Sequence, residues 1–273
     1  MASSLRLSAV ADNNYFICRI YGIVTLLSLI AICTSLNSRA QKAFDQYVKD
    51  GEGAIIKMPA KEKEVYLLFS AHDFGEGGNH IAKTLKRNKV GGSFFFTGDF
   101  LREKKNKKLI KRLIKNGHYI GSHSDKHLLY NDWTKRDSLL VSKKEFEVDL
   151  QNSLIQLNKL GIKKGEWYLP PYEWYNDSIV KWSKENGLTV INFTPGTGTN
   201  ADYTTPGMKN YRSSEQLMHR LFEVEKEKGL AGNLLLIHLG TDAARTDKFY
   251  YRLDEIIKRL RQQGYVLKKL PYL

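Results

Sequence analysis

Two short motifs contain residues that could together bind a metal ion. His123 and His127 are four positions apart in His-Ser-Asp-Lys-His, which places both imidazoles on one side of a helical turn or tight loop. About fifty residues upstream, His72-Asp73 follows an apolar run. Two histidines and a distant carboxylate form the type of site that holds Zn²⁺ while one coordination position stays open. The alternative is that the histidines are solvated or cap local structure.

Apolar runs and amphipathic stretches alternate along most of the chain, which predicts strands separated by helices. We expect strands over 65–70, 93–97, 119–122, 167–169, 188–193, 234–238 and 265–270, and helices over 107–116, 143–160, 178–186, 214–228 and 250–262. Glycines 117, 161, 187 and 264 follow four of these helices and predict left-handed C-terminal caps. Seven strands in βαβ units predict an α/β fold, a distorted or incomplete (β/α)7 barrel. The polar motifs follow strand ends, where such barrels build their active sites.

The N-terminal region resembles an export signal. Arg19 precedes the uncharged run Ile20–Cys33, which is shorter than the roughly 20 apolar residues of a membrane span, and small residues stand before Gln41. We therefore expect a signal peptide over residues 1–40, a linker over 41–62 and a catalytic domain over 63–273. This predicts export to the periplasm or the extracellular space. An uncleaved N-terminal membrane anchor is the alternative.

The chain is strongly basic, with a formal net charge of +14. Its densest basic run, Arg102–Lys115, has eight basic residues opposed only by Glu103. Apolar residues recur within this run at helical spacing, which predicts an amphipathic helix that shows lysines to water. Such a surface attracts polyanions. No nucleic-acid-binding motif accompanies the charge, so an acidic glycan or an anionic envelope surface is the more natural partner.

The predicted catalytic domain resembles the polysaccharide deacetylases of carbohydrate esterase family four, the NodB-homology domain. The strongest element is the family's His-Ser-x-x-His motif at His123 and His127. The family's Leu-x-x-His motif is intact at 235–238, and part of its Arg-Pro-Pro-Tyr-Gly motif is present at 170–172. The resemblance implies that Asp73 joins the two histidines as a ligand of a divalent metal. Zn²⁺ is expected, with Co²⁺ or Ni²⁺ as alternatives.

Two of the family's motifs are altered. His72 occupies the position of the family's catalytic base, an aspartate. Leu169 replaces the motif arginine that pairs with that aspartate in the family, and Glu173 replaces the motif glycine. Loss of both charged partners is coherent, because removal of one would leave a buried charge unpaired. A neutral His72 could act as a base near neutral pH, and Glu173 is a second candidate for the base or for a metal contact.

The remaining roles also follow from the resemblance. The backbone N–H of Tyr172 is expected to stabilise the oxyanion, and His238 to protonate the leaving group, with Asp202 as the candidate carboxylate that orients it. Aromatic faces stack on sugar rings, so Tyr172, Trp174 and Trp133 are candidate substrate contacts, together with Pro171.

The predicted function is that of a metal-dependent hydrolase that removes acetyl groups from a carbohydrate polymer, by N- or O-deacetylation. Its substrate would be an acetylated polysaccharide or oligosaccharide. The alternative is a catalytically impaired protein of the same fold that binds carbohydrate without turnover. Two further alternatives remain: an envelope-anchored interaction protein that uses its basic face, and a glycosidase with a carboxylate pair. The glycosidase leaves the two motif histidines without a task.

Overall fold

The structure is a computed structural model that describes residues 46–59, 62–162 and 165–272. The chain divides into two compact units, Met1–Tyr47 and Val48–Leu273, and the second is described below. The predicted signal peptide or anchor lies outside the described residues. Among the helices that are described, none has the length and hydrophobicity needed to cross a membrane.

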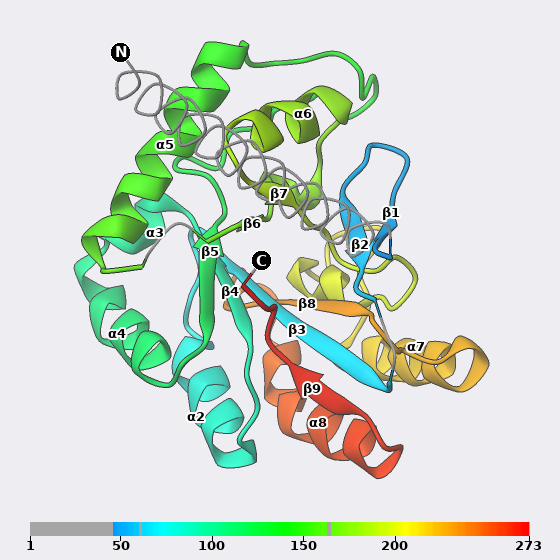
Figure 1. Cartoon of the computed structure of the whole chain (residues 1–273). Helices are drawn as coiled ribbons and strands as arrows, with labels where there is room; N and C mark the ends of the chain where they lie inside the picture. Colours follow the sequence, from blue (N-terminus) through cyan, green and yellow to red (C-terminus); the bar gives the residue numbers. More distant parts are fainter. Residues whose placement is uncertain (1–45, 60–61, 163–164, 273) are drawn as a thin grey trace, which may run out of the picture. The chain divides into compact units, whose positions relative to one another are not determined.

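A curled sheet of seven parallel strands forms the centre of this unit (Figure 1). Its path runs β7 (Thr189–Val190), β6 (Trp167–Tyr168), β5 (Tyr119–Ser122), β4 (Ser93–Phe96), β3 (Glu64–Ala71) and β8 (Leu234–His238), and β9 (Val266–Lys268) pairs with the first residues of β3. The central strand β3 is buried almost throughout, as expected of a parallel strand covered on both faces. The predicted incomplete (β/α)7 barrel is confirmed.

The strand register brings the polar motifs to one edge of the sheet. Ala71 of β3 lies opposite Phe96 of β4, which in turn lies opposite Ser122 of β5. On the other side of β3, Ser70 lies opposite His238 of β8. The residues that follow these positions therefore emerge together at the carboxyl end of the sheet, where α/β barrels carry their active sites.

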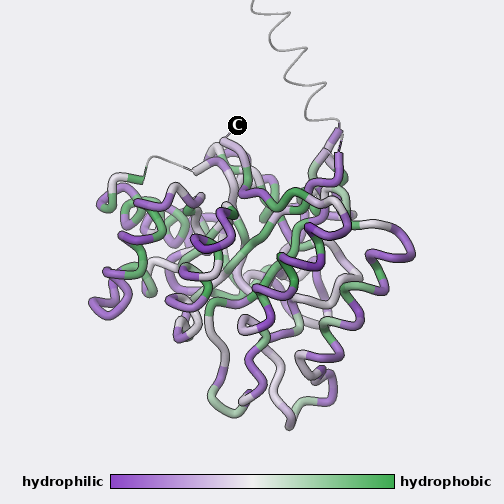
Figure 2. Tube along the Cα trace, turned by 90° about the horizontal axis from the view of Figure 1, so that it is seen from below, coloured by the Kyte–Doolittle hydropathy of each residue, from purple (hydrophilic) through white to green (hydrophobic). Residues whose placement is uncertain are grey.

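Helices surround the strands on the outside (Figure 1). They are α2 (Gly78–Asn88), α3 (Gly98–Arg102), α4 (Lys107–Lys115), α5 (Lys143–Lys159), α6 (Asp177–Glu185), α7 (Ser214–Lys228) and α8 (Leu253–Gln262), with single 3₁₀ turns η1 (Lys104–Asn106), η2 (Pro171–Glu173), η3 (Thr199–Tyr203) and η4 (Phe249–Arg252). Figure 2 shows hydrophobic stretches along the strands, while the helices alternate between hydrophobic and hydrophilic residues, as expected of helices that pack one face inward. The four predicted glycine caps have positive φ, between 70° and 84°.

The segment predicted as a linker is partly structured, which corrects the prediction. Within 41–62, strands β1 (Val48–Lys49) and β2 (Ile55–Lys57) form an antiparallel pair. Ile55 bridges to Ile191, just after β7, and Lys57 bridges to Asn233, just before β8. β2 thus spans the gap between the two ends of the curled sheet. Its apolar run is too short to be recognised as a strand from sequence, although Ile55 is buried in the structure.

His118 should make folding stability sensitive to acid. Its Nδ1 accepts a hydrogen bond from the Gly92 N–H, and burial, with a smaller contribution from Lys269, lowers its pKa to about 4. Because the folded pKa lies below the ordinary value of about 6.5, this stabilisation is complete above pH 6.5 and is lost as the pH falls towards 4. We expect the free energy of unfolding of the wild type to fall by about 2 kcal/mol more between pH 7 and pH 5 than that of His118→Gln. Urea unfolding at both pH values measures this difference. Identical pH dependence of stability in wild type and variant would contradict the role given to His118.

Candidate active site

A cavity of about 480 Å³ opens at the carboxyl end of the sheet. It is lined by Ser70, Ala71, His72, Asp73, Phe74, His123, His127, Trp133, Tyr172, Glu173, Tyr203, His238 and Gly240. These residues come from the last positions of β3 and β8, from the segments that follow β3, β5, β6 and β8, and from η3. The cavity therefore brings together most of the residues that the sequence singled out, from segments far apart in the chain.

His123 and His127 converge inside this cavity, with their Nε2 atoms 3.3 Å apart. His123 donates its Nδ1 proton to the Leu169 carbonyl oxygen at 2.7 Å, so its Nε2 carries a lone pair. Burial, reinforced by neighbouring histidines, lowers the pKa of His123 to about 3 and that of His127 to about 2, so both rings are neutral at neutral pH. Neutral imidazoles with one nitrogen fixed by a backbone carbonyl are typical metal ligands.

The loop that carries these histidines is held by a buried carboxylate. Asp149 of α5 accepts the backbone N–H groups of Asp125 and Lys126 at 3.1 and 2.8 Å, and the Tyr130 hydroxyl at 3.2 Å. The loop needs such support, because the non-glycine residues Ser124 and His127 have positive φ. Asp149 thus positions the two imidazoles from outside the cavity.

Asp149→Asn should therefore weaken metal binding without touching the metal. The amide keeps one acceptor oxygen and loses the other, so one of the two loop N–H groups loses its partner. We expect Zn²⁺ affinity to fall by roughly 10- to 100-fold, the range seen when groups that support metal ligands are removed. Calorimetric titration measures this, with Glu147→Gln on α5 as the control. Unchanged affinity in Asp149→Asn would show that the loop holds its shape without this carboxylate.

Two carboxylates are candidates for a third metal ligand beside the two histidines. Asp73 lines the cavity, but its side chain is 71% exposed and its Oδ1 lies 3.3 Å from Nε2 of His72. Glu173 is only 11% exposed, and its Oε1 lies 3.9 Å from Nε2 of His123. Within the described residues, no three His, Cys, Asp or Glu side chains form a complete metal-binding group. The histidine pair is therefore the preorganised part of the candidate metal site.

His72 packs against the pair. Its ring stacks on the ring of His127, with centroids 4.6 Å apart and an interplanar angle of 8°. Its Nδ1 lies 3.2 Å from the Thr97 hydroxyl, and its Nε2 faces Asp73. The side chain is thus fixed beside the cavity at both ring nitrogens.

Glu173 combines backbone strain with a shifted pKa. Tyr172 and Glu173 have φ values of 58° and 53°, in the left-handed region that costs a non-glycine residue about 1–2 kcal/mol. This explains why the corresponding family motif has glycine at position 173. Burial raises the pKa of Glu173 to about 7; the charge of His238 opposes the shift and that of Asp202 adds to it. A carboxyl group of this pKa can exchange a proton near neutral pH.

His238 is held by Asp202, the carboxylate suggested for this role from sequence. The Asp202 Oδ1 lies 2.6 Å from Nδ1 of His238, and its Oδ2 accepts the His238 backbone N–H at 3.0 Å. Burial lowers the pKa of His238. The charge and the hydrogen bond of Asp202, followed by the charge of Glu173, raise the pKa by more than burial lowers it, so the net shift is upward. His238 is thus oriented and favoured in its protonated form, as a proton donor requires.

Aromatic side chains line one wall of the cavity. Trp133 is 55% exposed, and its ring meets the ring of Tyr172 edge-on at 5.5 Å. Trp174, another predicted substrate contact, instead packs between Trp133 and the guanidinium of Arg136. Pro171 is buried. Neither Trp174 nor Pro171 is among the residues that line the cavity.

The sequence did not single out two aromatic residues of this cavity, Phe74 and Tyr203. Both are exposed, and Tyr203 lies edge-on to His238 at 5.6 Å. Each directly follows a candidate residue, Asp73 or Asp202, and that adjacency is the signal that could have identified them.

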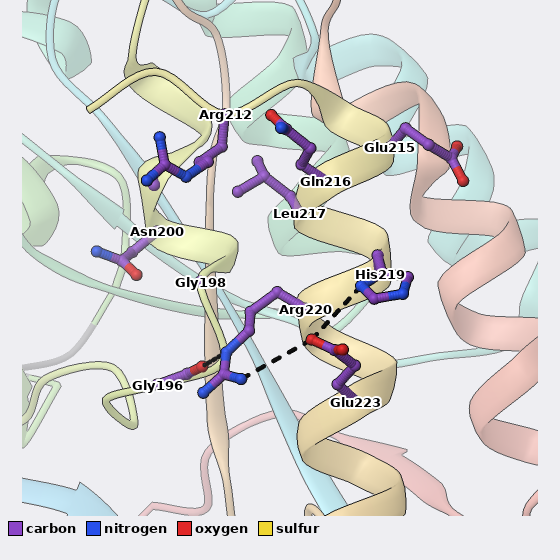
Figure 3. Close-up of a pocket in the computed structure, with 11 residues that line it drawn as sticks. Gly196, Gly198, Asn200, Arg212, Glu215, Gln216, Leu217, His219, Arg220 and Glu223 are labelled. Atoms are coloured by element: carbon purple, nitrogen blue, oxygen red, sulfur yellow. Dashed lines mark hydrogen bonds and ion pairs between the residues drawn. The ribbon is translucent and has the colours of Figure 1, made fainter. Parts of the chain in front are cut away.

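A larger cavity, of about 710 Å³, lies between residues 196–201 and α7 (Figure 3). Arg220 donates to the Gly196 carbonyl oxygen in this cavity, and both Arg220 and His219 pair with Glu223. It contains none of the predicted site residues. η3 borders both cavities, since Ala201 lines this one and Tyr203 lines the other.

The fold is an α/β barrel of the polysaccharide deacetylase type. Residues 57–191 match the family model "Polysaccharide deacetylase". A peptidoglycan-N-acetylglucosamine deacetylase of Bacillus cereus is 25% identical over 213 residues, which cover 77% of this chain and 87% of the relative. The peptidoglycan-N-acetylmuramic acid deacetylase PdaA of Bacillus subtilis is 27% identical over 215 residues, which cover 77% and 71%.

A solved structure extends the likeness in fold. A pseudoenzyme of carbohydrate esterase family four from Bacillus anthracis has a TM-score of 0.63 and 21% identity, over 81% of this chain and 68% of that one. A mutant of it with restored enzymatic activity aligns with the same TM-score. This chain belongs to the polysaccharide deacetylase family, as its motifs predicted.

Proposed function

We propose that this chain is a metal-dependent hydrolase that removes acetyl groups from a carbohydrate polymer. The observation that carries the proposal is the convergence of the neutral rings of His123 and His127 in a cavity that also holds His238, within a family of carbohydrate deacetylases. The Nε2 lone pair of His123 faces Nε2 of His127 at a distance that suits two ligands of one cation.

The residues present fit a divalent metal. His123 and His127 would hold it, with Asp73 as the third ligand by family resemblance and Glu173 as the more buried alternative. Imidazole with carboxylate suits Zn²⁺, and Co²⁺ and Ni²⁺ bind imidazole as well. Such an ion, when bound, polarises an acyl oxygen and makes a water more acidic.

The chain's own groups supply the proton transfers. Glu173 or His72 accepts a proton from the attacking water, and His238, held by Asp202, gives one to the leaving amine or alcohol. The backbone N–H of Tyr172 stabilises the negative charge that develops on the acyl oxygen. Trp133 and Tyr172 offer aromatic faces to the sugar rings.

The substrate we propose is an acetylated polysaccharide or oligosaccharide. The names of the Bacillus relatives point to peptidoglycan as one such polymer. We propose that the protein acts outside the cytoplasm, in the periplasm or the extracellular space. The N-terminal segment would serve as a signal peptide or as a membrane anchor.

A catalytically impaired protein that binds carbohydrate is the second candidate. His72 at the position of the family's base favours it, and a family pseudoenzyme shares the fold. Incubation of the protein and Zn²⁺ with N-acetylated chitooligosaccharides and peptidoglycan fragments, followed by mass spectrometry, separates the two. Loss of several acetyl groups per protein molecule supports the hydrolase. Binding of the same sugars without acetyl loss would establish the second candidate instead.

A further inference from the structure

One side of the unit carries more basic charge than its carboxylates balance: Glu103 lies within the basic run, and Arg87 of α2 pairs with Asp254. α2, η1 and α4 contain no Asp or Glu, and Arg112 of α4 donates to Asn79 of α2, so the two helices lie side by side (Figure 1). We define the lysine face as the exposed residues Lys104, Lys105, Lys107, Lys108, Lys111 and Lys115. In the part of the chain that the structure describes, no carboxylate forms a salt bridge with any of the six.

This face differs from an ordinary solvated helix. At about 100° per residue, Lys107, Lys108, Lys111 and Lys115 fall within a sector of about 100° on α4, while the apolar residues on the opposite side are buried. On α8, by contrast, Lys258 and Arg259 pair with the carboxylates four residues earlier, Asp254 and Glu255. Like charges gathered in one sector repel one another, and a polyanion relieves this repulsion.

A side cavity borders the candidate active site and includes one residue of the lysine face. It has a volume of about 270 Å³ and shares His72 and Asp73 with the catalytic cavity. Of the lysine face it includes Lys105 of η1, the turn that leads into α4, and its lining also holds Asp99, Arg102 and Glu103, with Arg102 paired to Asp99. A chain of sugars bound at the catalytic cavity therefore has a recess beside it that reaches Lys105, and the other lysines lie on the exposed surface beyond.

We infer that the substrate is an anionic glycan, whose carboxylate or phosphate groups bind the lysine face while an acetylated sugar occupies the catalytic cavity. The inference rests on the proposed function, because the recess begins at that site. A membrane-binding helix would expose apolar residues beside its lysines, whereas those of α4 are buried. Nucleic acid is disfavoured, because no binding motif accompanies the charge.

Binding to polygalacturonate, an unacetylated polyanion, tests the surface independently of turnover. We compare the full chain with the variant Lys107→Gln/Lys108→Gln/Lys111→Gln and with a charge-matched control, Lys181→Gln/Lys184→Gln/Lys226→Gln on α6 and α7. The lysine-face variant should bind at least about tenfold more weakly at low salt, the control within about twofold, and added salt should weaken the wild type. Equal losses in both variants, or tighter wild-type binding to duplex DNA or phosphatidylglycerol vesicles, would overturn the inference.

Acetate release then links the surface to the reaction. For an acetylated polygalacturonate, the lysine-face variant should raise KM about tenfold and leave kcat unchanged, while both constants stay unchanged for a neutral N-acetyl chitooligosaccharide. An equal KM for the acidic substrate in variant and wild type would contradict the inference even in an active enzyme. If no protein releases acetate from either substrate, the proposed function fails. The comparison of polygalacturonate binding in the two variants would then still decide whether the lysine face binds a polyanion.

Discussion

We expect replacement of either His123 or His127 by alanine to abolish Zn²⁺ binding and to reduce acetate release to background. Each change removes one of the two converging nitrogens, and a single imidazole with an exposed carboxylate does not hold the ion. His123→Ala also leaves the Leu169 carbonyl oxygen without its donor, which costs about 1–3 kcal/mol of stability. Calorimetry measures metal affinity, and a coupled assay measures acetate.

The matched control for this prediction is His219→Ala. His219 lies on α7, its side chain is 72% exposed, and its ion-pair partner is Glu223. His219→Ala should change neither the zinc affinity nor the rate of acetate release. Thermal unfolding of all three variants shows whether they remain folded. Zinc affinity in His123→Ala or His127→Ala equal to that of the wild type would contradict the assignment of these residues as ligands.

We expect Glu173→Gln to slow acetate release by roughly 10²- to 10⁴-fold, the usual contribution of a general base, and to change zinc affinity less than tenfold. Both candidate bases line the cavity, and we propose Glu173 because its carboxylate lies beside His123, whereas Nε2 of His72 faces Asp73. Glutamine keeps the size and the strained backbone of Glu173 but cannot accept the proton. Steady-state kinetics measure the rates.

Two further variants sharpen the assignment. His72→Asn should lower the rate less than tenfold, because its contacts with Thr97 and Asp73 are positional. Glu173→Gly should lose activity like Glu173→Gln, yet gain about 1 kcal/mol of stability, because glycine adopts a φ of 53° without strain. The opposite ranking, with His72→Asn inactive and Glu173→Gln active, would assign the base to His72.

The paired replacement of the family's charged residues has a structural explanation. Leu169 is fully buried, and its backbone carbonyl oxygen, which any residue at this position would provide, fixes the tautomer of His123. His72 forms its contacts without an arginine. No charge is left buried and unpaired by the two changes, so they are compatible with a stable cavity.

The main strands and helices could be predicted from sequence because their signals are local. Apolar runs marked every strand of the main sheet, and the five predicted helices begin and end within three residues of the observed bounds. β2 was missed because its position depends on strand ends far away in the chain. α2 was missed because it begins at Gly78, without a side-chain cap.

The candidate site could be predicted in composition but not in detail. The family motifs identified His123, His127 and His238, because their spacing and neighbouring residues are local features. Which carboxylate approaches the histidine pair depends on the left-handed backbone at Glu173, and no sequence pattern indicates that conformation. The support from Asp149 was missed for a related reason, since its contacts join a helix to a loop 23 and 24 residues away.

The central claim is that deacetylation depends on a metal held by the histidine pair, and a metal titration of activity tests it most directly. The protein is stripped with a chelator, and acetate release from an N-acetylated oligosaccharide is measured as Zn²⁺ is added back. We predict no release from the stripped protein and a rise in rate that saturates near about one ion per chain, with no recovery in His127→Ala. Release that persists after chelation, or that zinc restores equally in His127→Ala, would contradict the account.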